Sequence, residues 1–291
     1  MIGRLQAKIR RAGTVLVTCV VATSWGGGCG ARQPAGPVTP EHAASAPPVR
    51  ALRVGIAPMF PPLAFKQDGR IVGVEADFAR RLEGALGTTL TLVDTPWDEL
   101  IPALRDGRID VIMSGMSITE ARAQLVAFAH PYLRIGQMAL LRRRDAARFR
   151  SRTALDRRST RVGFVRDTTG AMYAREHLSH ATLRGFDSVD AGVAALRAGT
   201  IDAFIQDGPT VWRLTASQRG AGPGAAGGDL TGWYEPLTDE YLAWAVRQDD
   251  GGVRQQLNRI LKQWNDTGVL VDVLDDWITV GSPRGGERIV H

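Results

Sequence analysis

The sequence has only two cysteines among its 291 residues, Cys19 and Cys29, and no structural disulfide is expected from them. Cys19 lies in an apolar N-terminal segment that we expect to be removed, so the mature chain would keep one cysteine at most. The five histidines show no metal-binding spacing, since His177 and His180 form an isolated pair. No phosphate-binding loop, dinucleotide motif or GxSxG motif is present. The sequence therefore predicts no metal site and no cofactor, and it offers no catalytic set.

Positive charge is also scarcer than the formal net charge of +6 indicates. Residues 1–28 contain four basic and no acidic side chains, which leaves the rest of the chain near +2. The basic run 142–144 is followed by Asp145 and has no interleaved aromatic side chains. We interpret this run as a solvated connection, and no nucleic-acid partner is expected.

Residues 1–28 have the pattern of a secretory signal peptide, with a basic start and the apolar stretch 14–25, and no second apolar run follows. Three glycines precede Cys29, a position typical of lipoprotein cleavage with acylation of the cysteine. The alternative is ordinary cleavage further on, for example after Ala46. Residues 29–51 are rich in proline, alanine and glycine, and they predict a disordered linker.

Predicted strands and helices alternate along most of the chain, which is typical of a mostly parallel α/β sheet. The run LRVGIA at 52–57 predicts a buried strand, and 71–87 predicts a strand edge passing into a helix that Gly87 ends. A second unit begins with RVGFV at 161–165. Residues 253–265 carry apolar side chains on one side and predict an amphipathic helix. The chain is therefore expected to contain two similar α/β domains.

Nearly the same phrase occurs twice, as ALRDGRIDVIMSGMS at 103–117 and as ALRAGTIDAFIQDGP at 195–209. Each copy predicts the end of a helix, a turn with glycine and a short strand led by Ile-Asp. In open α/β sheets, ligands bind outside the carboxyl ends of the strands. We therefore interpret the shared part as scaffold. The differing segments that follow, Gly115 to Ser117 in one copy and Asp207 in the other, predict two walls of a binding cleft.

Two charged residues fall beside these segments. Ser117 and Glu120 have the spacing of a capping box, which predicts a helix with Arg122 in its first turn, either solvated or part of an anion site. Asp207 is either an ordinary turn residue before Gly-Pro or a carboxylate available to an ammonium group. Together on facing walls, the guanidinium and the carboxylate specify a zwitterion such as an α-amino acid.

Two aromatic residues follow predicted strands of the first domain. Phe60 lies in APMFPPLAF, where the two prolines exclude helix, and Trp97 follows the strand TLTLVDT. Aromatic residues at such positions cover a core. Alternatively, a ligand side chain lies between the two rings.

Several segments, taken in order, resemble the periplasmic solute-binding proteins of polar amino-acid ABC transporters, bacterial extracellular solute-binding family 3. They are LRVGIAPMFPPLAF, GVEADFARRL, WDELIPALRDGRIDVIMSGMSITEARAQLVAFAHPYL, RVGFVRDTTGAMYA and GTIDAFIQD. The resemblance implies the type II periplasmic binding protein fold, with two α/β lobes joined by a two-strand hinge at MALLRR and YLAWAV. The implied boundaries are 52–141 and 240–280 for lobe 1, 142–239 for lobe 2, and 281–291 for a tail.

The resemblance also implies a set of ligand-binding residues. They are Phe60, Trp97, Gly115, Ser117, Arg122, Thr169 and Asp207. Arg122 and Thr169 would bind the α-carboxylate of the ligand, and Asp207 its α-ammonium. Backbone and hydroxyl groups of 115–117 would also contact the ligand, and the two aromatic rings would stack on it.

The sequence departs from the family pattern in three places. Ile56 and Ala57 stand where many members have Thr-Asp, and the loss of that acid argues against a lysine or arginine ligand. Asp167 replaces a glycine and adds negative charge near the cleft, while an inward-pointing Arg166 would favour an acidic ligand. The glycine-rich segment 219–232 has no counterpart, and we interpret it as a surface loop.

The function implied by the resemblance is that of an extracytoplasmic receptor, not an enzyme. It would capture an amino acid by hinge closure and deliver it to an ABC transporter permease. We expect a monomer, attached to the membrane by a lipid anchor if Cys29 is acylated. The alternative is a periplasmic cyclohexadienyl (arogenate or prephenate) dehydratase-like enzyme on the same fold, for which Asp167 is the nearest candidate acid.

Overall fold

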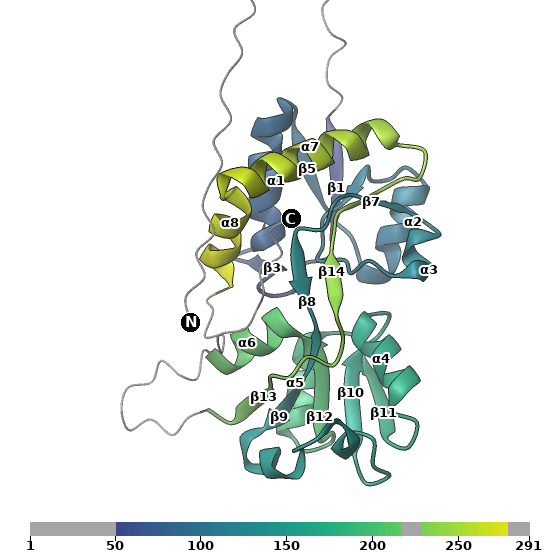
Figure 1. Ribbon diagram of the computed structural model, residues 1–291, viewed down its shortest axis with the longest axis vertical. Helices are drawn as coiled ribbons and strands as arrows, with labels where there is room; N and C mark the ends of the chain where they lie inside the picture. Colours follow the sequence, from purple (N-terminus) through teal and green to yellow (C-terminus); the bar gives the residue numbers. More distant parts are fainter. Residues whose placement is uncertain (1–50, 217–227, 279–291) are drawn as a thin grey trace, which may run out of the picture. The chain divides into compact units, whose positions relative to one another are not determined.

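The computed structural model describes residues 51–216 and 228–278. The predicted signal peptide, Cys29, nearly all of the linker and the tail lie outside these residues, as does most of the glycine-rich segment. The described residues belong to one compact unit, Pro47–His291. Two five-stranded sheets with flanking helices form two lobes within it (Figure 1). The architecture is the two-lobed α/β fold that was predicted.

The sheet of lobe 1 has five strands, of which β5, β1 and β6 pair in parallel and β15 runs antiparallel to both its neighbours, β6 and β7. Across the sheet the order is β5 (Leu90–Asp94), β1 (Leu52–Ile56), β6 (Val111–Ile112), β15 (Ala245–Val246) and β7 (Ala127–Phe128). The helices of this lobe are α1 (Val74–Leu86), α2 (Leu100–Arg105), α3 (Glu120–Ala123), α7 (Gly251–Thr267) and α8 (Val269–Trp277). As predicted, α1 ends at Gly87, whose left-handed φ of 63° suits glycine.

The sheet of lobe 2 repeats this arrangement, with β9 antiparallel to both its neighbours. The order is β11 (Thr182–Phe186), β10 (Arg161–Val165), β12 (Ala203–Asp207), β9 (Gln137–Arg142) and β13 (Leu230–Trp233). Its helices are α4 (Thr169–His177), α5 (Val189–Arg197) and α6 (Gly208–Ala216). In both sheets the strand led by the repeated Ile-Asp lies between the first parallel strand of the lobe and the antiparallel strand. The repeated phrase therefore occupies equivalent places in the two lobes.

Short elements complete the described chain. A small sheet of lobe 1 contains β2 (Met59–Phe60), β3 (Ala64–Gln67) and β4 (Arg70–Val72), and 3-10 turns span Trp97–Glu99, Arg143–Arg148 and Arg152–Ala154. The amphipathic prediction at the C-terminus is confirmed, because α7 buries Leu257, Ile260, Leu261 and Trp264. Within 51–216 and 228–278, no helix combines the length and the apolar character that a bilayer span requires.

One of the two strands that connect the lobes differs from the expectation, whereas the other expected strand, YLAWAV, begins in β14 and ends in β15 (Ala245–Val246). The antiparallel pair β8 (Leu133–Ile135) and β14 (Glu240–Leu242) lies between the two five-stranded sheets (Figure 1). The expected hinge strand MALLRR instead lies in β9, which pairs with β12 and β13 inside lobe 2. All six residues of β9 are buried, and such an apolar run is stable in the interior of a sheet rather than in a connection. Lobe 2 therefore starts near Gln137 rather than at 142.

The repeated Ile-Asp marks a shared polar cluster at the start of a strand in each lobe. Asp110, just before β6, accepts hydrogen bonds from the backbone N and the Nε of Arg53, both at 3.0 Å. Asp202, just before β12, accepts the same pair from Arg161, again at 3.0 Å. Both aspartates are at most 3% exposed. Each carboxylate therefore joins the beginnings of two neighbouring parallel strands.

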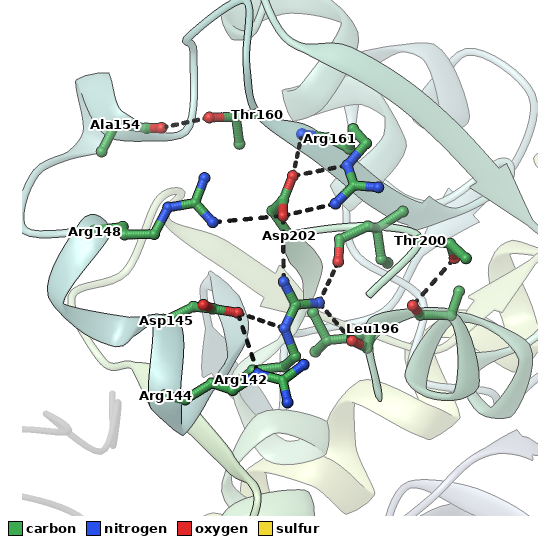
Figure 2. Close-up of polar contacts among 12 residues, drawn as sticks. Arg142, Arg144, Asp145, Arg148, Ala154, Thr160, Arg161, Leu196, Thr200 and Asp202 are labelled. Carbon is green, nitrogen blue, oxygen red and sulfur yellow. Dashed lines mark hydrogen bonds and ion pairs between the residues drawn. The ribbon is translucent and has the colours of Figure 1, made fainter. Parts of the chain in front are cut away.

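A second arginine completes each cluster from the antiparallel side of the sheet. Arg247 donates to Asp110 at 3.4 Å and to the carbonyl of Ile109. Arg142 donates to Asp202 at 3.2 Å and to the carbonyl of Ile201 (Figure 2). Both clusters lie at the amino ends of the parallel strands, whereas ligands bind at the carboxyl ends of those strands. The structure therefore supports the interpretation of the shared phrase as scaffold.

Candidate functional site

One pocket is lined by residues of both lobes and has about 430 Å³ of unfilled space, its open mouth included. The lining residues are Phe60, Leu63, Trp97, Ser114, Gly115, Ser117, Arg122, Ile135, Gln137, Thr168, Thr169, Gln206 and Asp207. All seven candidate residues from the sequence are among them. The pocket thus brings together segments that are more than a hundred residues apart in the chain.

Arg122 reaches the pocket from the short helix α3, but the helix is capped differently from the prediction. Thr119 is the capping residue, and its hydroxyl accepts a hydrogen bond from the backbone N of Arg122 at 3.2 Å. The predicted capping box at Ser117 is therefore wrong. Ser117 pairs with Leu242 of β14 through a backbone bridge, and its hydroxyl donates to Glu240 instead.

The guanidinium of Arg122 is surrounded by carbonyl groups and an aromatic ring. It donates to the carbonyl of Ser117 at 3.0 Å and to that of Asp167 at 3.1 Å, and its Cζ lies 5.3 Å from the centre of the Trp97 ring. Burial lowers the pKa of Arg122, while the charges of Glu240 and Asp167 oppose that shift. Arginine nevertheless stays protonated in proteins. None of the ion pairs among the described residues involves Arg122, so its charge remains available to an anion.

Asp207 ends β12 and also caps helix α6. Its Oδ1 accepts a hydrogen bond from the backbone N of Thr210 at 2.8 Å. Within 51–216 and 228–278, no residue other than Thr210 donates a hydrogen bond to the carboxylate, and no ion pair to it is found. Burial raises the pKa of Asp207, the hydrogen bonds from Thr210 lower it, and the negative charge of Glu240 raises it further. The turn interpretation of Asp207 is confirmed by this contact, and its side chain also lines the pocket, so its role toward an ammonium group stays a prediction.

The two aromatic rings contact each other. Phe60 and Trp97 meet edge to face, with ring centres 5.3 Å apart and an angle of 69° between their planes. The indole Nε1 of Trp97 donates to the carbonyl of Asp167 in lobe 2 at 2.9 Å. In this arrangement no ligand side chain fits between the rings, contrary to the geometry considered from the sequence. The rings instead form one wall of the pocket.

Gly115 and Thr169 line the pocket, and each makes a hydrogen bond to a neighbouring side chain. Gly115 has a φ of +64°, and its N donates to Glu75, a buried carboxylate that also accepts from Tyr132 and Trp244. Burial raises the pKa of Glu75, and these hydrogen bonds oppose the shift. Thr169 begins α4, and its hydroxyl accepts from Gln137 at 3.1 Å. Thr168 and Thr169, at the amino end of α4, both line the pocket, and the backbone N–H groups of a helix start favour an anion.

Comparison with known proteins agrees with the resemblance seen in the sequence. The model of the bacterial extracellular solute-binding proteins, family 3, matches residues 52–280, which is more than half of the chain. The chain belongs to this family.

Relatives of known sequence include binding proteins for amino acids. A probable histidine-binding protein of Campylobacter jejuni is 31% identical over 160 residues, which cover 55% of this chain and 60% of that protein. The chain therefore spans less than two thirds of that relative. The histidine-binding periplasmic protein of Salmonella typhimurium is 29% identical over 229 residues, 75% of this chain and 83% of that protein.

Solved structures of the family share the fold. The crystal structure of an ancestral amino acid-binding protein, described as a precursor of cyclohexadienyl dehydratase, superimposes with a TM-score of 0.70. It is 30% identical, and the match covers 78% of this chain and 95% of that chain.

Three further polar residues of this family member were not singled out from its sequence. Gln137 and Gln206 line the pocket, and Glu240 lies directly behind Ser117. Gln206 is 3% exposed, and its side chain makes no hydrogen bond to another described residue. Gln206 directly precedes Asp207 at the end of the predicted strand, and this position could have indicated that it lines the pocket. Gln137 and Glu240 belong to no motif, and their place depends on how β9 and β14 pair.

Neither Arg166 nor Asp167, both considered from the sequence, lines the pocket with its side chain. Arg166 pairs with Asp187 at the surface, so it does not point inward as an acidic ligand would need. Asp167 has a left-handed φ of 58°, and it contributes its carbonyl to the contact with Arg122 and Trp97. Among the described residues, no group of three or more potential metal ligands is found.

Proposed function

We propose that the chain is an extracytoplasmic receptor that captures a free α-amino acid in the pocket between its lobes. One observation carries the proposal. Arg122 of lobe 1 and Asp207 of lobe 2 line the same pocket, and neither is neutralised by an ion pair with another described residue. A guanidinium and a carboxylate that share a pocket without pairing are complementary to a small zwitterion.

The α-carboxylate of the ligand would lie at Arg122 and at the amino end of α4, near Thr169. The α-ammonium would lie at Asp207. Hydrogen bonds to charged groups contribute about 1.5–3 kcal/mol each. A few of them, offset by the costs of desolvation and closure, correspond to micromolar affinity, about −8 kcal/mol. The cross-lobe hydrogen bonds from Trp97 and Arg122 to the carbonyl of Asp167 support closure around the ligand.

The remaining lining groups favour an uncharged ligand side chain. Arg122 and Asp207 are the charged residues of the lining, and both are used by the charges that every amino acid carries. Ser114, Gln137 and Gln206 are then left for the ligand side chain, and their hydroxyl and amide groups are neutral. The buried Ala57 supplies no carboxylate for a lysine or arginine.

Delivery of the ligand to an ABC transporter permease, and attachment to the membrane through Cys29, are parts of the same proposal. The family and the name of the periplasmic relative support the first. The position of Cys29 after an apolar segment supports the second. The chain is proposed to act as a monomer.

The dehydratase alternative is the weaker candidate for a structural reason. Its candidate acid, Asp167, does not line the pocket, and the contact it makes there is through its backbone carbonyl. Incubation with prephenate, followed by a test for phenylpyruvate, separates the two functions. Formation of phenylpyruvate at a rate above that of an Asp167→Asn variant would favour the enzyme.

The receptor proposal is tested by a thermal-shift screen of the twenty amino acids, followed by calorimetry. A ligand that binds the native state raises the melting temperature. We expect Arg122→Ala to weaken binding by about 100-fold, from the loss of charge-assisted hydrogen bonds. Arg254→Ala, on the exposed side of α7, is the control and should bind as the wild type does.

The outcomes of this screen separate two claims. If no amino acid shifts the wild-type melting temperature, or if Arg122→Ala binds undiminished, the receptor site is wrongly assigned. If the ligands are lysine and arginine alone, the inference of an uncharged side chain fails, while the zwitterion site stands.

A further inference from the structure

Glu240 is a buried acid that contacts Ser117, a residue of the pocket lining, without lining the pocket itself. It lies in β14, one of the two strands between the lobes, and is 8% exposed. Its Oε2 accepts a hydrogen bond from the Ser117 hydroxyl at 2.6 Å, and its Oε1 accepts one from the Thr238 hydroxyl at 2.6 Å. Both distances are short, as expected for hydrogen bonds to a carboxylate. Glu240 itself is not part of the pocket lining.

The direction of these hydrogen bonds is fixed by a backbone group. The backbone N–H of Gln137 donates to the Thr238 hydroxyl at 2.8 Å, and a backbone N–H can only donate a hydrogen bond, never accept one. The Thr238 hydroxyl therefore accepts from Gln137 and gives its own proton to Glu240. An ionised carboxylate accepts only, so the Ser117 hydroxyl must also donate to Glu240. A serine has one hydroxyl proton, so the side of Ser117 Oγ that faces the pocket presents lone pairs alone.

The charge of Glu240 acts on both ends of the site. It opposes the effect of burial on Arg122, and it raises the pKa of Asp207. Glu240 therefore adds negative potential around the pocket without occupying it. That potential and the lone pairs of Ser117 favour the same kind of group, a hydrogen-bond donor with positive charge.

From this arrangement we infer that Glu240 is a positioning residue for the ammonium of the ligand. It orients the Ser117 hydroxyl as an acceptor, so that Ser117 and Asp207 together receive the ammonium protons. Glu240 thereby selects ligands that carry an α-ammonium over acids that lack it. This inference rests on the proposed function, because it assumes that the zwitterion binds in this pocket.

A double-mutant cycle tests the role of Glu240, using the amino acid that gives the largest thermal shift in the twenty-member screen. Glu240→Gln removes the charge at nearly constant shape, and we expect affinity to fall about tenfold, the weight of one hydrogen bond to a charged group. In a Ser117→Ala background, Glu240→Gln should lower the affinity much less, because the hydroxyl that Glu240 orients is absent. Glu235→Gln, at an exposed position before β14, is the matched control and should bind normally.

The deaminated analogue of that amino acid, which keeps the carboxylate but lacks the α-ammonium, provides a second readout. A purely structural role of Glu240 would not change the affinity for the two ligands differently. The affinity for the analogue, measured at concentrations up to millimolar, should not fall in Glu240→Gln, whereas that for the amino acid falls. Equal losses for both ligands, an undiminished affinity for the amino acid, or an equal loss in the Ser117→Ala background would each overturn the inference.

A measurement on the unliganded protein separates this inference from the proposed function. Glu240 raises the pKa of Asp207, so Glu240→Gln should lower that pKa in a carbon-13 titration of the Asp207 carboxyl. If no amino acid binds the wild type, the proposed function fails while this titration still reports on Glu240. An unchanged pKa of Asp207 would show that Glu240 does not act on the ammonium end of the site.

Discussion

Replacing Asp202 by asparagine should destabilise lobe 2 more than any exposed charge substitution. The carboxylate accepts three hydrogen bonds from Arg161 and one from Arg142, and Arg148 approaches it to 3.7 Å (Figure 2). Burial by itself raises the pKa of Asp202, but the hydrogen bonds from Arg161 and the nearby positive charges outweigh it, and the net pKa is lowered. The ionised form is therefore stabilised by folding.

The size of the effect follows from which arginines remain buried. Removing one partner of a buried pair costs about 3–5 kcal/mol. The Arg161 and Arg148 side chains are 45% and 50% exposed, so water compensates much of their loss. Arg142 is buried and keeps the carbonyls of Leu196 and Ile201. We therefore expect the lower end, about 3 kcal/mol, or roughly 6–12 °C in melting temperature for a domain of this size.

Chemical denaturation of the unliganded protein measures this loss. Asp266→Asn, which breaks an exposed pair with Lys262, is the control and should cost less than about 1 kcal/mol. Asp110→Asn in lobe 1 should behave like Asp202→Asn, because Asp110 has the equivalent arginine partners. The stability that Asp202 contributes is present above the ordinary aspartate pKa and is lost as the pH falls through the lowered pKa. A loss no larger than that of Asp266→Asn would refute the buried-cluster argument.

Two further predictions concern the pocket. Gly115→Ala should destabilise the protein by about 2 kcal/mol or more and weaken amino-acid binding, because the φ of Gly115 is +64° and an added Cβ would lie 2.7 Å from Leu63. The control is Gly69→Ala, at a φ of +75° with open space around it, which should cost about 1 kcal/mol of stability and leave binding unchanged. Equal losses of stability for the two variants in chemical denaturation would contradict this prediction. Asp207→Asn should abolish binding yet leave the unliganded protein at least as stable at neutral pH, since asparagine also caps α6 and burial raises the pKa of Asp207. For the wild type, that raised pKa means that stability declines as the pH rises from the ordinary aspartate value through the raised one. The variant should lack this decline in denaturation series over pH, and a variant as unstable as Asp207→Ala would count against the assignment.

Much of the scaffold is predictable from local pattern. The strand at Leu52–Ile56, the helix that ends at Gly87 and the amphipathic helix α7 agree with their sequence signals, because each depends on residues close together in the chain. The capping box was wrong for a reason that no local pattern contains. Ser117 has a stronger partner in Glu240, 123 residues away, so Thr119 caps the helix instead.

The boundary between the lobes likewise depends on contacts that local sequence patterns do not contain. An apolar run such as MALLRR fits a connecting strand or a sheet interior equally well by pattern. Pairing with β12 and β13 decides the matter for β9, and that pairing brings Gln137 to the pocket.

The sequence by itself determined the alternation of strands and helices and the repeated Ile-Asp unit, because side-chain periodicity and strand ends are local properties, and its resemblance to the family implied the candidate residues that line one pocket. Tertiary structure alone decided where the lobes divide, that Phe60 and Trp97 contact each other, and that Glu240 accepts the Ser117 proton. The physical reason is that a side chain bonds to the group that packing brings within 3 Å, and that group is set by the whole fold rather than by its neighbours in sequence.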